Sequence, residues 1–329
     1  MSSSSLTVYQ EVALPTAPAL LYNNIVVHRD GDYVSYASPT AVVSVQTATG
    51  APCFPPLELP AGTYAQFLAG VTDPAIENIT LVAALSNRTA IVVVNGQQTH
   101  SVDTSGVTET YTCAAMTRVA DTEAILLVLG GSEGSIDTVR CTPQGRPIST
   151  TPPSVPVQAH EHCSITALDV NISTADSSKA AEMVSGDSAG HVVLWRAWNP
   201  TLTVSPPETT DAVTAVKWLP QNGRVAVAYG GGQIKIVERE SGAAAVVIQA
   251  HSRWINAMAY NAARQLLVSA AEDGHIFVWD ANATDPDRVC VARGNVSHEL
   301  LTGVAMIGTH GVVALLSYDV RRLRLMSSG

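Results

Sequence analysis

Three residue types that form the catalytic triad of many hydrolases occur within one stretch of this chain. They are His251, Ser269 and Asp273. In a hydrolase the hydroxyl would attack as nucleophile, the imidazole would take its proton, and the carboxylate would orient the imidazole. The chain has no G-x-S-x-G turn of the kind that exposes such a nucleophile.

Trp279 lies ten residues after Ser269 and suggests a structural role for this set. The imidazole of His251 can donate to the carboxylate and accept from the Ser269 hydroxyl, whose oxygen accepts the indole N–H. Each buried polar group then has a partner. We therefore interpret His251, Ser269, Asp273 and Trp279 as a structural tetrad, and we predict no catalytic residues.

The segment His160-Glu161-His162-Cys163 contains residue types that bind zinc. Alternate residues of a strand point the same way, so two imidazoles and a thiolate could converge. No second ligand pair stands at zinc-site spacing, and His160 or His162 is needed for a second tetrad. We expect no metal and no cofactor. Gly130-Gly131 and Gly230 to Gly232 lack the Lys and Ser or Thr of a phosphate loop and are read as turn glycines.

Composition favours a β-rich protein that does not bind nucleic acid. Of 329 residues, 46% are hydrophobic and 14% charged, with 23 Gly and 18 Pro, which suits many short buried strands joined by tight turns. The net charge of −10 gives no basic excess for phosphate. Five cysteines without a C-x-x-C pair favour a reducing compartment. The start of the chain shows no signal peptide, and no long apolar run predicts membrane insertion. We expect a cytoplasmic protein.

The tetrad belongs to a repeat that occurs more than once. Ser185 and Trp195 repeat the spacing of Ser269 and Trp279, with the turn Asp displaced to Asp187. A His, Ser, Asp and Trp at these positions followed by Asp280 are typical of a WD repeat, which folds as a four-stranded blade. At about 40 to 45 residues a blade, the length fits an all-β, seven-bladed WD40 propeller. We expect one domain over residues 1–329, with residues 1–5 flexible.

Strand-like runs bounded by Gly, Pro, Asn or Asp can be laid out at this period. The runs expected as strands are 23–28, 33–37, 41–47, 79–85, 90–94, 124–129, 136–141, 224–229, 233–238, 288–293, 301–307, 312–318 and 321–326. The Pro-rich stretch 147–156 is either an edge strand or an exposed loop. The blade near Val237 is degenerate, since Val replaces Trp. The last blade lacks one strand, and residues 7–13 are expected to supply it and close the ring.

The arrangement resembles WD-repeat propellers and, more narrowly, the family of WD repeat-containing protein 54. The narrower resemblance rests on phrases spread along the chain: Leu21-Tyr-Asn-Asn24, Asp187-Ser-Ala-Gly190, Ala228-Tyr-Gly230, Gln249-Ala-His251, Leu267-Val-Ser-Ala270 and Tyr318-Asp319.

This resemblance implies a non-enzymatic protein-interaction scaffold, of a kind common in ciliary and flagellar assemblies. One alternative is a microtubule-associated structural component of the axoneme. Another is a substrate receptor of a ubiquitin ligase, which the sequence disfavours because Asn282 stands where such receptors carry Arg or Lys.

Two groups of residues are candidates for binding a partner protein. Arg253 and Trp254 follow the loop His and are residue types enriched at binding hot spots. Trp254 could instead only cover the apolar edge of its own blade. Arg321, Arg322 and Arg324 could meet an acidic surface such as that of tubulin, or could lie on a solvated strand edge.

Overall fold

The computed structural model describes residues 3–71, 80–102, 110–119, 124–144, 146–149, 160–171, 182–206, 211–286 and 288–328. Within these ranges the helical structure is confined to short 3-10 turns, of which η1 (Arg29–Gly31) is described in full. None of the described residues form a helix of the length and hydropathy that a membrane span requires.

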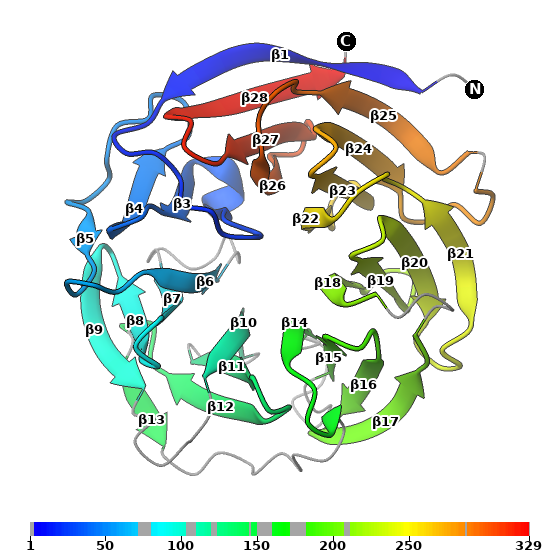
Figure 1. Cartoon of the computed structure of the whole chain (residues 1–329), viewed down its shortest axis with the longest axis horizontal. Helices are drawn as coiled ribbons and strands as arrows, with labels where there is room; N and C mark the ends of the chain where they lie inside the picture. Colours follow the sequence, from blue (N-terminus) through cyan, green and yellow to red (C-terminus); the bar gives the residue numbers. More distant parts are fainter. Residues whose placement is uncertain are drawn as a thin grey trace.

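The strands form antiparallel sheets arranged around a central opening, like the sectors of a ring (Figure 1). The described residues make five four-stranded sheets and one eight-stranded sheet. The first three sheets in chain order are β2 (Val26–His28), β3 (Tyr33–Ala37), β4 (Ala41–Gln46) and β5 (Leu57–Glu58); β6 (Ala65–Gly70), β7 (Thr80–Leu85), β8 (Ala90–Val94) and β9 (Gln97–Val102); β10 (Tyr111–Arg118), β11 (Ile125–Gly131), β12 (Ile136–Cys141) and β13 (Pro147–Ser149).

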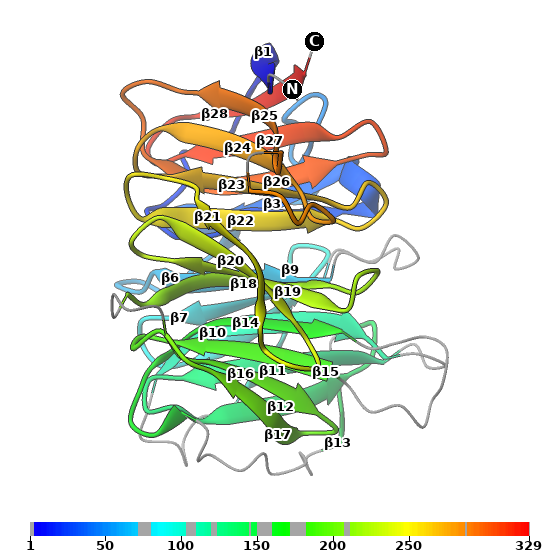
Figure 2. The ribbon, with the colours of Figure 1, turned by 90° about the vertical axis from the view of Figure 1, so that its right-hand side faces the viewer.

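The remaining strands complete the ring, and the side view shows the sheets stacked face against face (Figure 2). They are β14 (Ile165–Asn171), β15 (Glu182–Asp187), β16 (Val192–Arg196) and β17 (Asn199–Val204); β18 (Val213–Leu219), β19 (Arg224–Tyr229), β20 (Gln233–Glu238) and β21 (Ala244–Gln249); and the eight-stranded sheet of β22 (Ile255–Asn261), β23 (Leu266–Ala271), β24 (His275–Asp280), β25 (Cys290–Asn295), β26 (Leu301–Ile307), β27 (Val312–Ser317), β28 (Arg322–Ser328) and β1 (Ser4–Ala13). The prediction of an all-β propeller is confirmed.

The middle strands are apolar on both faces because each sheet is covered by a neighbour on either side. Every residue of β7, β8 and β11 is buried, whereas the outer strand β17 is largely exposed. Strands buried on both faces read as continuous apolar runs and not as alternation. Each hydrophobic cluster found among the described residues lies between two successive sheets or the two halves of the eight-stranded sheet.

Strand β1 closes the ring, as the sequence predicts. It pairs antiparallel with β28 from Leu6↔Ser328 to Ala13↔Arg322, with a bulge at Tyr9. Residues Ser4 and Ser5 pair in parallel with β25, which joins the last two groups of four strands into one sheet. Both views place the two ends of the chain side by side (Figures 1 and 2).

Two expected boundaries are corrected by the structure. Residues 4 and 5, expected to be flexible, belong to β1 because β25 offers them a free edge. Residues 23–25, expected to start a strand, precede β2, and Asn23 has φ 53°, outside the extended region. Residues 147–149 of the Pro-rich stretch form the edge strand β13, and residues 150–156 lie outside the described ranges.

An arginine at the closure joins β1, β28 and the loop before β26. Arg324 is 6% exposed; its Nε donates to Glu11 at 2.9 Å and its Nη2 to Glu299 at 2.6 Å. Arg322 donates to Glu11 at 3.0 Å from a side chain that is 48% exposed. The two arginines therefore share one carboxylate in very different surroundings.

We expect Arg324→Gln to lower the free energy of unfolding by about 3 kcal/mol, because it leaves the partly buried Glu299 without its cation and removes one of the two arginines that bind Glu11. Arg322→Gln, the matched control, should cost less than about 1 kcal/mol, as exposed ion pairs do. Urea denaturation of the two variants checks this. Equal losses would show that the closure does not depend on the buried pair.

Candidate functional site

The side chains of the predicted tetrad are brought together between β23, β24 and the loop before β22. The Nδ1–H of His251 lies 3.2 Å from both oxygens of Asp273, and its Nε2 accepts from the Ser269 hydroxyl at 2.8 Å. The indole of Trp279 donates to the same Ser269 oxygen at 2.9 Å. Every polar atom of this chain of hydrogen bonds has a partner inside the blade.

A second tetrad has the same connections in the sheet β14–β17. His160 donates to Asp187 at 2.9 Å and accepts from Ser185 at 2.6 Å, while Trp195 donates to Ser185 at 2.8 Å. Of the two candidates for the loop His, the structure uses His160. Asp187 reaches the imidazole from two residues after Ser185 because alternate side chains of a strand lie on one face.

The two aspartates also fasten the turns beside them. Asp187 accepts from the backbone N–H groups of Ala189 and His191, and Asp273 accepts from those of Ser252 and His275. Burial alone would raise the pKa of each carboxyl, but hydrogen bonds from the His and the backbone N–H groups outweigh it, so both pKa values lie below the usual range. The carboxylates are therefore ionised acceptors.

Burial makes both tetrads unsuited to hydrolysis. Ser185 and Ser269 are 0% exposed. The lone pair of each hydroxyl oxygen is engaged by an indole, so no substrate carbonyl can approach it. The residue types of a triad serve here to satisfy buried polar groups.

A third buried histidine, His28, was not recognised from the sequence. Its Nδ1 donates to the Val71 carbonyl of the next sheet at 3.2 Å, and its Nε2 accepts from Ser35 at 3.1 Å. The hydroxyl oxygen of Ser44 lies 2.7 Å from that of Ser35. Ser44 thus donates to Ser35 the hydrogen bond that the Trp indole N–H donates to the serine in each of the two tetrads. Burial lowers the pKa of His28 to about 4.

The segment from His160 to Cys163 does not converge on a common point. His160 turns inward to its tetrad, whereas Glu161 and His162 are exposed, and His162 has φ 54°. Across the described ranges no three His, Cys, Asp or Glu side chains are grouped closely enough to hold a metal ion.

The three arginines near the C-terminal end, which the sequence offers as candidates for binding a partner, all contact acceptors of this chain, and Arg321 and Arg322 are also exposed. Arg324 is buried between Glu11 and Glu299, and Arg322 is paired with Glu11. Arg321 donates to the backbone carbonyls of Leu14 and Pro15. Each of the three guanidinium groups therefore contacts a carboxylate or a backbone carbonyl near the closing strand β1.

Arg253 and Trp254 lie on the crossover face, which we define as the face where the chain passes from the outer strand of one sheet to the inner strand of the next. Figure 1 looks onto it. Arg253 is exposed and Trp254 is half-buried. The ring of Trp254 covers Gly230, where an added Cβ would come within 2.5 Å of the indole. It also lies 6.2 Å from the ring of Tyr22.

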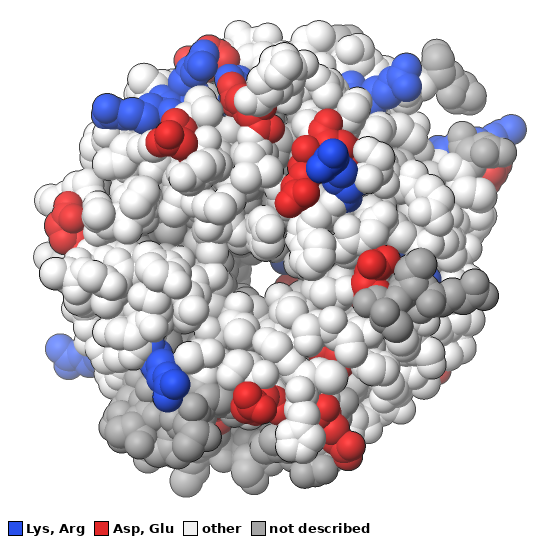
Figure 3. All heavy atoms as spheres, viewed as in Figure 1, with Lys and Arg blue, Asp and Glu red and all other residues white. Residues whose placement is uncertain are grey.

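Three further exposed apolar side chains lie on loops of this face, and one of them, Tyr22, lies beside Trp254. Leu20 is 57% exposed, Tyr22 44% and Tyr318 43%. The turn after Tyr318 is bonded to the loop of Leu20 through Asp319 N–H and Pro18 O at 3.1 Å. We call Leu20, Tyr22, Trp254 and Tyr318 the apolar ledge. On the crossover face charged side chains lie mostly away from the central opening (Figure 3).

The loop that carries Leu20 and Tyr22 is fixed by two asparagines, of which Asn24 is buried and Asn23 partly buried. Asn24 is 0% exposed; its amide donates to Ala37 O at 2.8 Å and accepts from Ala37 N at 2.7 Å, and its own N–H donates to Thr302 O at 2.9 Å. Asn23 donates from its backbone to Asn256 O at 3.0 Å and accepts from Met258 N at 3.1 Å. The loop is thus tied to β22, β26 and β3.

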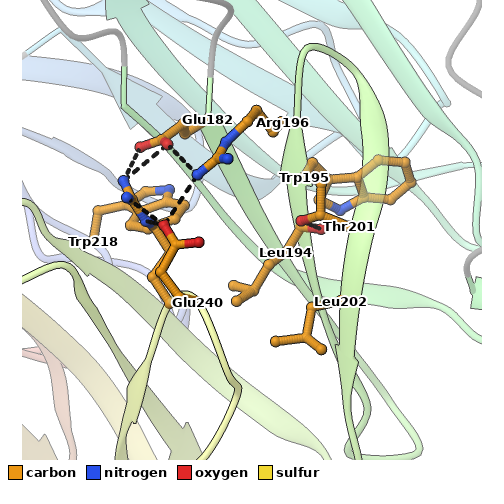
Figure 4. A pocket seen from close by; sticks show the side chains of 9 residues that line it. Glu182, Leu194, Trp195, Arg196, Thr201, Leu202, Trp218 and Glu240 are labelled. Atoms are coloured by element: carbon orange, nitrogen blue, oxygen red, sulfur yellow. Dashed lines mark hydrogen bonds and ion pairs between the residues drawn. The ribbon is translucent and has the colours of Figure 1, made fainter.

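A small cavity of about 180 Å³ lies between the sheets β14–β17 and β18–β21. Its mouth carries alternating charges (Figure 4): Arg239 reaches Glu182 at 2.9 Å and Glu240 at 2.6 Å, and Arg196 reaches Glu240 at 3.2 Å. The volume is below the roughly 300 Å³ at which ligand pockets begin. We interpret these four charged side chains as a set of ion pairs that hold the two sheets together.

Comparison with known proteins decides the family. A model of the family WDR54 matches residues 9–328. The chain belongs to the WDR54 family. WD repeat-containing protein 54 of Mus musculus is 34% identical over 104 residues, which cover 31% of this chain and 30% of the mouse protein. The Homo sapiens protein is 26% identical over 156 residues, 45% of this chain and 46% of that protein. These matches span less than half of each relative.

Solved structures support the fold of this WDR54-family chain. Raptor of Chaetomium thermophilum superposes with a TM-score of 0.75 at 12% identity, covering 99% of this chain and 30% of that one. A chain of the mitotic checkpoint complex gives a TM-score of 0.74 at 17% identity and covers 97% and 93%. At such identities the likeness shows the WD40 propeller fold alone.

Apart from Trp254, sequence reasoning missed the residues of the ledge, together with His28 and the asparagines of this WDR54-family chain. Tyr22 belongs to one of the phrases that carry the resemblance, but nothing in its type indicated exposure. The one available signal was the pair Asn23-Asn24, since adjacent asparagines favour a loop over the start of a strand.

Removing either tetrad hydroxyl should destabilise the fold. We expect Ser185→Ala and Ser269→Ala each to lower the free energy of unfolding by about 1 to 3 kcal/mol, because an indole N–H and an imidazole nitrogen lose their buried partner. Denaturant unfolding measures this. Ser241→Ala, at an exposed serine, should stay within about 0.5 kcal/mol; losses no larger than this at the tetrads would refute their structural role.

The buried His28 should make stability depend on pH. Its folded pKa of about 4 lies below the ordinary histidine pKa of 6.5, so the unfolded chain binds the proton first and stability is lost as the pH falls. Between about pH 7 and about pH 5 this amounts to about 2 kcal/mol of unfolding free energy. His28→Gln should flatten the pH dependence by that amount, whereas His298→Gln, at an exposed position, should not. If wild type and His28→Gln showed the same dependence of unfolding free energy on pH, the lowered pKa would not belong to His28.

Proposed function

We propose that this chain is a rigid protein-interaction scaffold that binds a partner protein through the apolar ledge. WD-repeat family membership supports a scaffold. The observation that carries the choice of surface is the exposure of Leu20, Tyr22 and Tyr318 on the face of Trp254. Leu20 and Tyr22 lie on a loop that the hydrogen bonds of Asn23 and Asn24 hold in place. Exposed apolar groups gathered on one face are typical of binding sites.

Rigidity is the physical reason that this surface suits binding. Ordering a flexible apolar loop on association costs conformational entropy, which reduces affinity. Here the backbone on either side of Tyr22 is already fixed by Asn24 and by contacts to Asn256 and Thr302. Tyr and Trp also bring large contact areas with few rotatable bonds, which makes them frequent hot spots.

The cellular setting is a separate proposal that rests on the resemblance. A ciliary or flagellar assembly, or a microtubule-associated place in the axoneme, remains our prediction for the partner's context, alongside a cytoplasmic pool. Arg322 and Arg324 are paired with Glu11 and Glu299, which leaves less unpaired positive charge here for an acidic surface such as that of tubulin. Asn282 continues to disfavour the ubiquitin-ligase receptor.

The double variant Leu20→Ala, Tyr22→Ala should lose its specific partners while keeping its fold. Affinity purification of the tagged chain from ciliated cells, fractionated into cytosol and detergent-resistant axoneme, should show enrichment of those partners falling by about tenfold or more, as expected when two anchors of a hot spot are truncated. Retention of the wild-type protein with axonemal proteins would support the ciliary setting.

The matched control is Tyr64→Ala. Tyr64 is 57% exposed on the same face but lies in the loop before β6, away from the ledge. Both proteins should unfold at the wild-type temperature, since the altered side chains are exposed. An unchanged partner set for the double variant, or an equal loss for Tyr64→Ala, would refute the ledge as the binding surface.

A further inference from the structure

The two aromatic rings of the apolar ledge offer a face to a cation. The rings of Tyr22 and Trp254 lie 6.2 Å apart with 30° between their planes. Tyr22 is 44% exposed and the Trp254 side chain is half-buried against Gly230. The negative potential of such ring faces attracts a Lys or Arg cation within about 6 Å of the ring centre.

A carboxylate lies beside these rings. Glu272 donates its backbone N–H to the Trp254 carbonyl at 3.0 Å, which places the two residues side by side in the chain's neighbouring loops. Burial and the Glu272 charge raise the pKa of the Tyr22 phenol, in keeping with a carboxylate close to that ring. The Glu272 side chain is exposed and forms no ion pair with any residue of the described ranges.

Two neighbouring charges complete the surroundings. Asp273 is engaged by His251 and by backbone N–H groups, so it adds negative potential without being free to move. Arg253 is exposed on the loop that carries Trp254. The chain as a whole has a net charge of −10, which draws cationic partners toward it at low salt.

From this geometry we propose that the ledge binds an arginine side chain on a basic segment of the partner protein, with its guanidinium against Tyr22 and Trp254 and its charge met by Glu272. The inference rests on the proposed function and names the chemistry of the partner. Arginine fits better than lysine because its planar group stacks on an aromatic ring and pairs with a carboxylate at the same time.

An anionic partner held by Arg253 is the competing arrangement. In that arrangement the positive charge of Arg253, and not the negative charge of Glu272, would attract the partner. Removing either charge therefore changes the affinity in opposite directions in the two arrangements. Arg253→Gln should leave arginine binding unchanged or tighter, whereas Glu272→Gln should weaken it.

The test is an NMR titration of the whole chain with N-acetyl-arginine amide, followed at the indole N–H signals of its 5 tryptophans. The Trp254→Phe variant identifies the signal of Trp254. We expect this signal to shift saturably with the arginine amide and less with the lysine amide. Glu272→Gln and Tyr22→Ala should each weaken binding by about three- to fivefold, the range of an exposed cation–π contact or ion pair.

The control Glu161→Gln changes the net charge equally at an exposed residue of the crossover face before β14 and should leave the titration as in wild type. The inference is overturned if the Trp254 signal does not move, if Glu272→Gln has no effect, if Arg253→Gln abolishes binding, or if N-acetyl-glutamate amide shifts the signal equally. If the ledge variants also keep all partners in cells, the proposed function itself fails; if they lose partners while the titration is silent, only the arginine preference fails.

Discussion

Packing of each sheet against both of its neighbours is the constraint on which the molecule depends. A lone four-stranded unit of this chain would leave the apolar faces of strands such as β7 and β11 in water. In a ring every face has a neighbour, but only if the ring closes. The decisive cluster is therefore the one that joins Val12 and Leu14, from the start of the chain, to Leu323 near its end and Val34 of the next sheet.

The same constraint determines where the polar groups go. Strands stacked face to face bury any hydroxyl, imidazole or indole N–H they carry, and each such group is costly unless paired. The tetrads of His160 and His251 solve this within one blade, and His28 solves it across two sheets with Val71. Arginines follow a similar rule, since Arg324 pairs with Glu299 in the loop before β26 of the eight-stranded sheet and Arg239 pairs with Glu182 of the preceding sheet.

Features that recur in several blades could be predicted from the sequence, whereas contacts that occur only once in the molecule could not. Ser269 and Trp279 lie at a spacing that a second blade repeats, so the fold and the closing strand could be inferred. Asp187 looked displaced because spacing along the chain is a poor guide when alternate strand residues share a face. Arg324 could not be assigned, because its partners Glu11 and Glu299 are 313 and 25 residues away. The exposure of Tyr22 follows from the fold of Asn23 and Asn24 and has no signature of its own.

The loop that carries Leu20 and Tyr22 exposes apolar side chains to solvent, although most apolar side chains of this fold are buried. Leu21 enters the core at 6% exposure, while Leu20 and Tyr22 on either side of it remain outside. If the loop were loose, these two side chains could turn inward and escape water. The hydrogen bonds of Asn23 and Asn24 to three inner strands prevent that collapse. A backbone that is held so firmly in a conformation unfavourable for two of its apolar side chains is better explained by binding than by stability alone.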